Sequence, residues 1–468
     1  ERGDVISADD LRVVYVSSDE AVARMGESQM SEVVGRVALV DLAPGTLLTR
    51  SVVADRPTLE QGEGIVGLSL DPGGYPDLGL APGDRVTIVR SGDAAAAEWL
   101  KRVRATDAQF IHGARIFAHP GGKALLAETA IGGTLALEYQ KLILATGARE
   151  RFIPFPGWTL PNVLGAGGLQ ALVKSGLPIA GKRVVVAGTG PLLLAVAASL
   201  KKRGAQVLLI AEQAPFTKLM SFGVQVMRSA SKLKQALALK LQLRGVPQRF
   251  NCWPVAAHSD AAHGQERLVG VTLRQGARTF EVACDYLACG FHLVPNVELA
   301  ALLGCALRDS CVVADEFQQT SVPDFFCAGE STGIGGVEVA LVEGQIAGLV
   351  ASGQHHAARE LFPARAAAQQ FADALNHAFA LRPELKRLLQ ADTLVCRCED
   401  VSFARLQAQP DWRAAKLHTR CGMGPCQGRI CGPAVEFLLG WQVASVRPPV
   451  FPASIGSLAQ ISSPTSGE

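Results

Sequence analysis

The feature that most constrains the fold is an apolar strand that ends in a glycine turn and leads into a helix. Residues 182–187 read Lys-Arg-Val-Val-Val-Ala and are followed by Gly188-Thr-Gly190-Pro. An apolar helical stretch covers residues 192–203, and a second strand-like run covers residues 206–210. A strand, a helix and a second strand in this order form a βαβ unit, which builds parallel sheets covered by helices. The sequence therefore predicts an α/β fold.

The turn in this unit has the chemistry of a dinucleotide site. Gly188 permits the tight turn, and Gly190 lets a pyrophosphate approach the helix N-terminus. Glu212 is spaced to hydrogen-bond a ribose hydroxyl, and an acid there favours NAD or the adenosine of FAD over a 2′-phosphate. Leu193 stands where a third glycine is usual, and we expect it to widen the packing of helix on strand. A Rossmann-like unit that no longer binds a dinucleotide is the alternative.

Two further strands end in small residues. Residues 141–145 run into Thr146-Gly147, and residues 325–328 run into Gly329-Glu330 and a glycine-rich turn. Small residues at a strand end let the backbone approach a cofactor closely. For Glu330, an ordinary role as a helix N-cap is the alternative reading.

Five cysteines crowd into a short stretch near the C-terminus. A Cys-x-Cys pair and a later Cys-x4-Cys pair supply four thiolates, enough for a tetrahedral zinc ion or the two irons of a [2Fe–2S] cluster. The spacing allows either Cys421 with Cys426 or Cys426 with Cys431 as the second pair, so it does not choose between them. The odd total of 11 cysteines and their irregular spacing favour a metal over disulfides. The other six stand singly and are predicted to be small buried hydrophobes.

Composition excludes several classes of function. The 468 residues are 48% hydrophobic, include 48 glycines and carry a net charge of +2, which is typical of a folded α/β protein. No basic run with interleaved aromatic residues indicates nucleic-acid binding. No apolar run approaches the roughly 20 residues of a membrane helix. With no signal peptide visible, these features predict a cytoplasmic protein that reaches a membrane only through partners.

The chain divides into five expected regions. The first alternates short apolar runs with Gly and Pro turns, which is the pattern of a small all-β module. The second holds the dinucleotide-binding features, the third is Ala-rich and helical, the fourth carries the cysteines, and the fifth is an extended apolar tail suited to docking on a partner chain. Their ranges are 1–92, 93–352 with an inserted dinucleotide unit at 179–285, 353–388, 389–446 and 447–468.

Several motifs, taken in order, resemble known families. The glycine- and proline-punctuated segments at 35–36, 43–48 and 80–86 resemble a SAF domain of pilus- or flagellum-assembly proteins. The motifs at 145–150, 188–191, 289–296, 327–330, 396–399 and 422–429 resemble the alpha subunits of multi-subunit opine, proline and D-hydroxyproline dehydrogenases, relatives of sarcosine oxidase and hydrogen cyanide synthase. The C-terminal part resembles a bacterioferritin-associated-ferredoxin-type [2Fe–2S] domain.

This resemblance implies a disulfide-reductase-type FAD/NAD(P)-binding fold and an electron relay. Substrate oxidation would occur at a flavin on a separate beta subunit, within a hetero-oligomer that includes small subunits, and no catalytic residue of this chain is assigned. Cys421 would be a spare thiol. The implied cluster ligands are Cys396, Cys398, Cys426 and Cys431, and the implied cofactor-binding residues are Thr146, Gly147, Gly188, Gly190, Glu212, Gly329 and Glu330.

One departure from the family lies upstream. Relatives open with a strand and a Gly-x-Gly-x-x-Gly turn that cradles the FAD pyrophosphate, and here the SAF-like segment stands in that place. We therefore expect impaired FAD binding and a sheet with an unpaired edge. The alternative function is a non-enzymatic SAF-domain interaction protein with a degenerate oxidoreductase scaffold. The amino-acid substrate and the terminal electron acceptor are not encoded in any motif.

Overall fold

The computed structural model describes residues 108–109, 111, 113–129, 133–227, 229–260, 267–442 and 446–462, and the short strands β1 (Val37–Ala38) and β2 (Val53–Ala54). The chain separates into two compact units, Glu1–Ile88 and Val89–Glu468. In the first unit, β1 and β2 pair antiparallel. The other strands expected within residues 1–92 lie outside the described residues.

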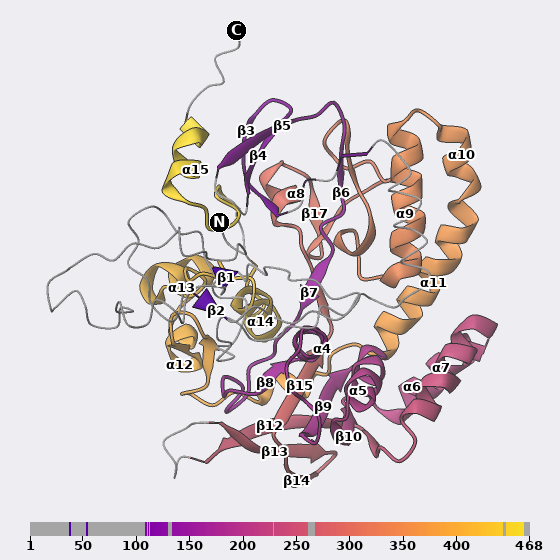
Figure 1. Ribbon diagram of the computed structural model, residues 1–468, viewed down its shortest axis with the longest axis vertical. Coiled ribbons are helices and arrows are strands. Elements are labelled where there is room, and N and C mark those ends of the chain that lie inside the picture. Colours follow the sequence, from indigo (N-terminus) through magenta and orange to yellow (C-terminus); the bar gives the residue numbers. More distant parts are fainter. Residues whose placement is uncertain are drawn as a thin grey trace, which may run out of the picture. The chain divides into compact units, whose positions relative to one another are not determined.

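The second unit contains a five-stranded parallel sheet with the strand order β11-β10-β9-β15-β8 (Figure 1). Its central strand β9 is buried along almost its whole length, as expected for a parallel strand covered on both faces. The expected βαβ unit is thus confirmed as β9, α5 and β10. The elements of this region are β8 (Val163–Gly165), α4 (Ala166–Lys174), β9 (Arg183–Thr189), α5 (Leu192–Lys202), β10 (Gln206–Glu212), α6 (Phe216–Met227), α7 (Ala230–Gln242), β11 (Gln248–Phe250) and β15 (Tyr286–Phe291).

Side chains of β9 alternate between two hydrophobic cores because successive residues of a strand point to opposite faces. Val184 and Val186 pack with residues of α4 and α5. Val185 and Ala187 pack against an antiparallel three-stranded sheet on the other face. The strands of that sheet are β12 (Cys252–Ser259), β13 (Leu268–Gln275) and β14 (Arg278–Ala283).

A shorter parallel pair, β6 with β19, lies at the other end of the unit (Figure 1). Among the described strands, β6 pairs with β19 alone, so its second edge has no partner there. The helix α9 packs on Phe326 and Ala328 beside it. The surrounding elements are β3 (Ala114–Gly121), β4 (Ala124–Thr129), β5 (Thr134–Glu138), β6 (Leu142–Leu144), β7 (Ala148–Glu150), β16 (Leu293–Pro295), α8 (Glu298–Leu302), β17 (Leu307–Arg308), β18 (Cys311–Val312), β19 (Phe325–Cys327), η5 (Gly329–Ser331), α9 (Gly336–Ala351), α10 (His355–Glu360), α11 (Phe362–Ala378) and η6 (Pro383–Arg387).

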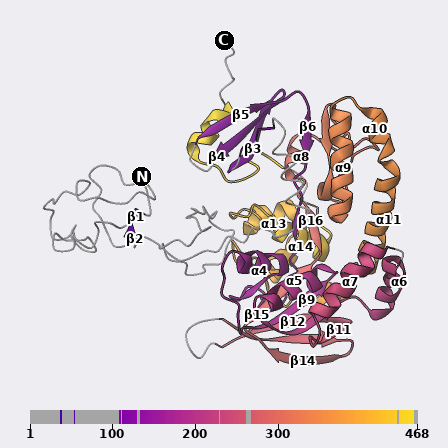
Figure 2. The same cartoon turned by 45° about the vertical axis from the view of Figure 1, so that its right-hand side comes forward.

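The cysteine domain is a small helical unit with its own core around Trp412 and Val435. Figure 2 shows α13 and α14 between the β3–β5 sheet and the five-stranded sheet. No helix within the described residues is long and apolar enough to cross a membrane. The elements here are β20 (Leu394–Cys396), β21 (Val401–Ser402), α12 (Phe403–Gln407), α13 (Trp412–Thr419) and α14 (Cys431–Leu439).

The tail packs on its own chain, through α15 (Ile455–Ala459) and η7 (Gln460–Ser462). Leu458 and Ile461 cover Phe117 of β3, and the backbone N–H of Val450 donates to the Phe117 carbonyl at 2.7 Å. These contacts are within the chain, and docking of this segment on a partner chain stays a prediction. The apolar face of the β3–β4 pair needs a cover, and the tail provides it within the same chain.

Candidate functional site

Two predicted cofactor-binding segments meet at the carboxyl ends of β6 and β19. The pairing of Leu144 with Cys327 places the turn after each strand side by side. The hydroxyls of Thr146 and Ser331 lie 2.8 Å apart, and Ser331 Oγ also donates to the Gly147 carbonyl at 3.3 Å. Gly147 and Gly329 have positive φ angles of 67° and 78°, which explains why both turns contain glycine. The structure thus brings Thr146, Gly147 and Gly329 together.

Glu330 directs its carboxylate to the start of α9. Its oxygens accept hydrogen bonds from the backbone N–H groups of Gly335 at 3.1 Å and Gly336 at 2.9 Å. A carboxylate at this position satisfies free N–H groups and complements the positive end of the helix dipole. This geometry favours the helix-capping alternative for Glu330 in the ligand-free chain, and its role in cofactor binding stays a prediction.

Glu343 was not predicted as a site residue, yet it holds the Gly329 turn. Its side chain is 2% exposed and accepts from the Gly329 backbone N–H at 2.9 Å and from the Thr332 hydroxyl at 2.8 Å. Burial raises the pKa of this carboxyl, although the hydrogen bond from Gly329 opposes the rise. Arg365 of α11 lies 3.7 Å from it. Glu343 lies 14 residues after Gly329 in the sequence, so the hydrogen bond between them is seen only in the folded chain.

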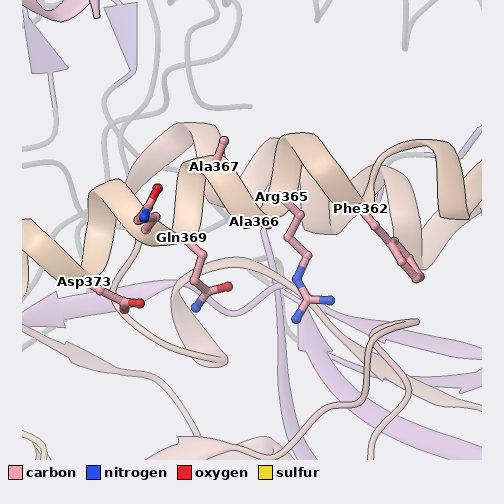
Figure 3. A pocket seen from close by; sticks show the side chains of 7 residues that line it. Phe362, Arg365, Ala366, Ala367, Gln369 and Asp373 are labelled. Carbon is pink, nitrogen blue, oxygen red and sulfur yellow. The ribbon is translucent and has the colours of Figure 1, made fainter. Parts of the chain in front are cut away.

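A hollow of about 670 Å³ opens beside α11. Figure 3 shows Arg365, Gln369 and Asp373 projecting from the same side of this helix. None of the predicted site residues lines the hollow, and within the described part of the chain Arg365 links it to the site through its contact with Glu343. The lining residues are Phe362, Arg365, Ala366, Ala367, Gln369, Gln370 and Asp373.

The predicted dinucleotide turn is present at the carboxyl end of β9. A Cβ on Gly188 would lie 2.0 Å from the Gly290 carbonyl oxygen of β15, so the sheet requires glycine there. Gly190 has a φ of 95° and open space beside it. Glu212 is 6% exposed and accepts from the backbone N–H groups of Gly190 and Ala214, each at 2.8 Å. Burial raises the pKa of Glu212 to about 7. The Glu212 carboxyl therefore binds the backbone of the glycine turn, and its predicted hydrogen bond to a ribose stays a prediction.

Leu193 fits its position because the neighbouring strand has a glycine. A Cβ on Gly290 of β15 would lie 2.9 Å from Leu193 Cδ2, and Leu193 is 1% exposed. The room for the larger side chain thus comes from Gly290. Gly290 lies on β15, nearly 100 residues after Leu193, so the sequence around Leu193 gives no sign of it.

Residues 379–382, here called the strap, fasten the helical connector to the dinucleotide unit. Thr189 Oγ1 donates to the Phe379 carbonyl at 3.0 Å, and Gln213 Nε2 donates to the Ala380 carbonyl at 3.0 Å. The guanidinium of Arg382 donates to Asn251 Oδ1 at 2.6 Å and stacks 3.9 Å over the Trp253 ring. Sequence reasoning missed this contact, because Thr189 was read only as the middle residue of the turn.

The five cysteines of residues 389–446, the region here called the cysteine domain, form one cluster of thiols. We call this cluster the nest; its members are Cys396, Cys398, Cys421, Cys426 and Cys431. The sulfur atoms of Cys396, Cys421 and Cys431 all lie within 4.8 Å of one another, and all three residues are buried. Cys426 hydrogen-bonds to Cys431 and to Cys398, which is the exposed member. All four predicted ligands are thus brought together, and Cys421 joins them. In the structure all eleven cysteines are free thiols, and of the six outside the nest five are buried and Cys311 is half-buried.

Hydrogen bonds within the nest favour thiolate at two positions. Hydrogen bonds from Cys421 and Cys431 lower the pKa of Cys396 to about 2, and a hydrogen bond from Cys431 lowers the pKa of Cys426 to about 5. The bond to Cys396 raises the pKa of Cys421 to about 12, and burial raises that of Cys398 to about 11. Soft thiol donors gathered in this way fit an iron–sulfur cluster or a thiophilic ion and do not suit a hard cation.

Two arginines near the nest are held by other groups of the chain. Arg420 forms an ion pair with Glu399 at 2.7 Å. Arg429 donates to the Val450 carbonyl at 2.6 Å and stacks 4.0 Å over the Phe451 ring of the tail. Burial lowers the pKa of Arg429.

The nest also contacts the strand that follows the Thr146–Gly147 turn. Arg149 Nε of β7 donates to the Arg429 carbonyl at 3.0 Å, and Arg151 Nη1 donates to the Pro433 carbonyl at 3.3 Å. Arg149 is held in turn by an ion pair with Glu298 at 2.8 Å. The residues that flank Cys426 and Cys431 are therefore hydrogen-bonded to the chain segment that directly follows the Thr146–Gly147 turn.

The fold and these two glycine turns define an oxidoreductase of the FAD/NAD(P)-binding, disulfide-reductase type. The chain belongs to the pyridine nucleotide-disulphide oxidoreductase family, whose model matches residues 31–346. The model of the SAF domain matches residues 1–54. The expected SAF domain and the expected FAD/NAD(P)-binding, disulfide-reductase-type fold are thereby confirmed, and FAD and NAD(P) are the cofactor classes that the family supports. The resemblance of the C-terminal part to a [2Fe–2S] domain stays a prediction.

Curated relatives are named as subunits of larger enzymes. An opine oxidase subunit from Rhizobium meliloti is 30% identical over 411 residues, which are 81% of this chain and 89% of the relative. Hydrogen cyanide synthase subunit HcnB of Pseudomonas aeruginosa is 33% identical over 329 residues, which are 63% of this chain and 69% of the relative.

Among solved structures, the L-proline dehydrogenase from P. horikoshii is 17% identical with a TM-score of 0.46, and the match covers 74% of this chain and 64% of that one. A ferredoxin reductase from Rhodopseudomonas palustris is 22% identical with a TM-score of 0.40, and the match covers 58% and 60%. These two likenesses carry no inference about activity.

Proposed function

We propose that this chain is the electron-transferring subunit of an amino-acid dehydrogenase complex of the opine or D-hydroxyproline type. Its family and its relatives, which are named as subunits of an oxidase and a synthase, support an oxidoreductase that works in a hetero-oligomer. The proposed partner is a catalytic beta subunit with its own flavin, together with small subunits. The proposed location is the cytoplasm, and nucleic acid is not a proposed partner.

The observation that carries this proposal is the set of hydrogen bonds between the residues beside Cys426 and Cys431 and the residues that follow the Thr146–Gly147 turn. Arg149 binds the Arg429 carbonyl, and Arg151 binds the Pro433 carbonyl of α14. A group held at that turn would therefore have a short path through bonded residues to the thiols. Such proximity is what an electron relay needs, and a structural zinc site has no use for it.

The thiols fit a [2Fe–2S] cluster by their chemistry. When bound, such a cluster supplies one-electron transfer. The proposed ligands Cys396, Cys398, Cys426 and Cys431 give four soft donors, and the core around Trp412 keeps the inner ones dry. The backbone N–H of Gly422 also donates to Cys396 and would stabilise the charge of the thiolate.

The dinucleotide sites have separate proposed roles. Gly190 and Glu212 would bind the pyrophosphate and ribose of NAD at the start of α5. The proposed FAD site consists of Thr146, Gly147 and the Gly329–Glu330 turn. We expect its affinity for FAD to be low, because the SAF-like segment stands where relatives carry the first nucleotide-binding motif. To bind a ribityl or ribose hydroxyl, Glu330 would have to leave the N–H groups of α9.

The optical spectrum of the anaerobically purified chain, before and after dithionite, tests the proposal. Iron, sulfide, zinc and flavin should be measured on the same sample. We expect broad visible absorption that bleaches on reduction, with about two irons per chain. Zinc without iron would make the nest a structural metal site. A colourless, metal-free chain that binds neither FAD nor NAD would favour the alternative, a SAF-domain interaction protein on a degenerate scaffold.

A further inference from the structure

The nest contains one thiol more than a [2Fe–2S] cluster uses. Such a cluster takes four cysteine ligands. The proposed ligands include two of the three buried thiols, Cys396 and Cys431, and omit the third, Cys421. Yet the sulfur atoms of Cys421, Cys396 and Cys431 all lie within 4.8 Å of one another. The inference below rests on the proposed function.

The backbone around Cys421 holds its side chain in the nest. Helix α13 ends at Thr419, and the next residue, Arg420, caps it with a left-handed φ of 66°. The Cys421 N–H donates to Thr419 Oγ1 at 3.2 Å. Gly422 follows with a φ of 79°, and a Cβ there would lie 2.7 Å from the Trp412 ring. Cys421 is 0% exposed. Its sulfur is therefore shielded from solvent and hydrogen-bonds with Cys396 and Cys431.

The other two thiols form the outer part of the nest. Cys398 is exposed, and its thiol hydrogen-bonds to that of Cys426. Cys426 in turn contacts Cys431. Two ligand positions are thus supplied by Cys398 and Cys426, while three buried thiols compete for the other two positions.

We propose that Cys421 is an exchangeable cluster ligand that can replace Cys431 or Cys396. In the exchange, one iron–sulfur bond to the departing cysteine breaks and one bond to Cys421 forms. Cys421 loses its thiol proton, and the departing thiolate takes one up, so the total charge and the oxidation state do not change. The alternative is that Cys421 only fills the core around Trp412 as a small apolar residue.

The experiment compares C431A with the double variants C431A/C421A and C431A/C252A. Cys252 is a matched control, because it is a fully buried cysteine that lies outside the nest. Each chain is purified anaerobically, and iron, sulfide and the electron paramagnetic resonance spectrum of the reduced sample are measured. We expect C431A and C431A/C252A to keep the cluster with altered g values. C431A/C421A should hold at least about tenfold less iron.

Equal iron loss in C431A and C431A/C421A, with an unchanged circular dichroism spectrum, would overturn the inference. If C431A does not fold, the pair C396A and C396A/C421A makes the same comparison at the other buried position. Cys421→Ser in the C431A background gives a spectroscopic readout, because an oxygen ligand shifts the visible absorption to higher energy. A wild-type chain without iron would overturn the proposed function and this inference together, whereas an iron-containing wild type with an empty C431A would overturn the inference alone.

Discussion

The parallel sheet around β9 and the strand pair β6–β19 share a local motif, a glycine turn beside an acidic residue, but differ in how deeply that motif is buried. In both, an apolar strand ends in a glycine turn, and an acidic side chain folds back onto backbone N–H groups near a helix start. The β9 turn lies between two cores and against a neighbouring strand. The β6 turn has one described neighbouring strand and an exposed Thr146. Because the two turns share a motif and differ in burial, we expect the buried β9 turn to contribute more to the unfolding free energy than the β6 turn.

The largest expected difference comes from the glycines of the two turns. Gly188→Ala places a Cβ against the Gly290 backbone and should cost more than about 4 kcal/mol of unfolding free energy. Gly147→Ala meets open space and should cost about 1–2 kcal/mol from its left-handed φ alone. Urea denaturation of both variants measures the two costs. Equal losses would show that the two turns are equally constrained.

A pH titration of stability tests the burial of Glu212. Its pKa in the folded chain is about 7, above the ordinary 4.5, so the native state binds more protons than the unfolded state between these values. The unfolding free energy should therefore fall by about 3 kcal/mol as the pH rises through this window. Glu212→Gln should abolish that fall, as followed by the urea midpoint at several pH values. An unchanged slope in the variant would mean that other groups produce the pH dependence.

Glu343 tests how firmly the more open turn is held. Glu343→Ala leaves the buried N–H of Gly329 without its acceptor and should cost about 2 kcal/mol. Hydrogen exchange at Gly329 should accelerate in the variant. Glu338→Ala is the matched control on the same helix, because its half-exposed ion pair with Lys232 should contribute less than about 1 kcal/mol. A larger effect from Glu338 would contradict the central role given to Glu343.

The smallest expected effect concerns a strand residue of the shorter pair. Ile143 of β6 is 40% exposed, so Ile143→Ala should cost less than about 1 kcal/mol. Val186 of β9 is 0% exposed, and Val186→Ala should cost about 2 kcal/mol. Thermal unfolding of the two variants compares the strands directly. A large loss at Ile143 would mean that a further element covers β6.

The sequence predicted local features well and long-range partners poorly. The βαβ unit followed from apolar runs and glycines, which act within a few residues. Four of the five thiols in the nest were assigned as ligands from their spacing and family resemblance, and the glycine turns at Gly147 and Gly329 were expected from the strands that precede them. Gln213 and the strap, Glu343 with Gly329, and Gly290 beneath Leu193 were missed, because each pair joins residues that only the fold brings together. Cys421 was set aside as spare on the family resemblance, because the spacing did not choose between the two cysteine pairs.

The strap has a mechanical consequence. The Phe379 carbonyl is bonded to Thr189 of the β9 turn and the Ala380 carbonyl to Gln213 after β10, and the same stretch of chain continues through η6 into β20 and the nest. A displacement of the dinucleotide unit would therefore be passed along a short, hydrogen-bonded stretch of backbone to the cysteine region.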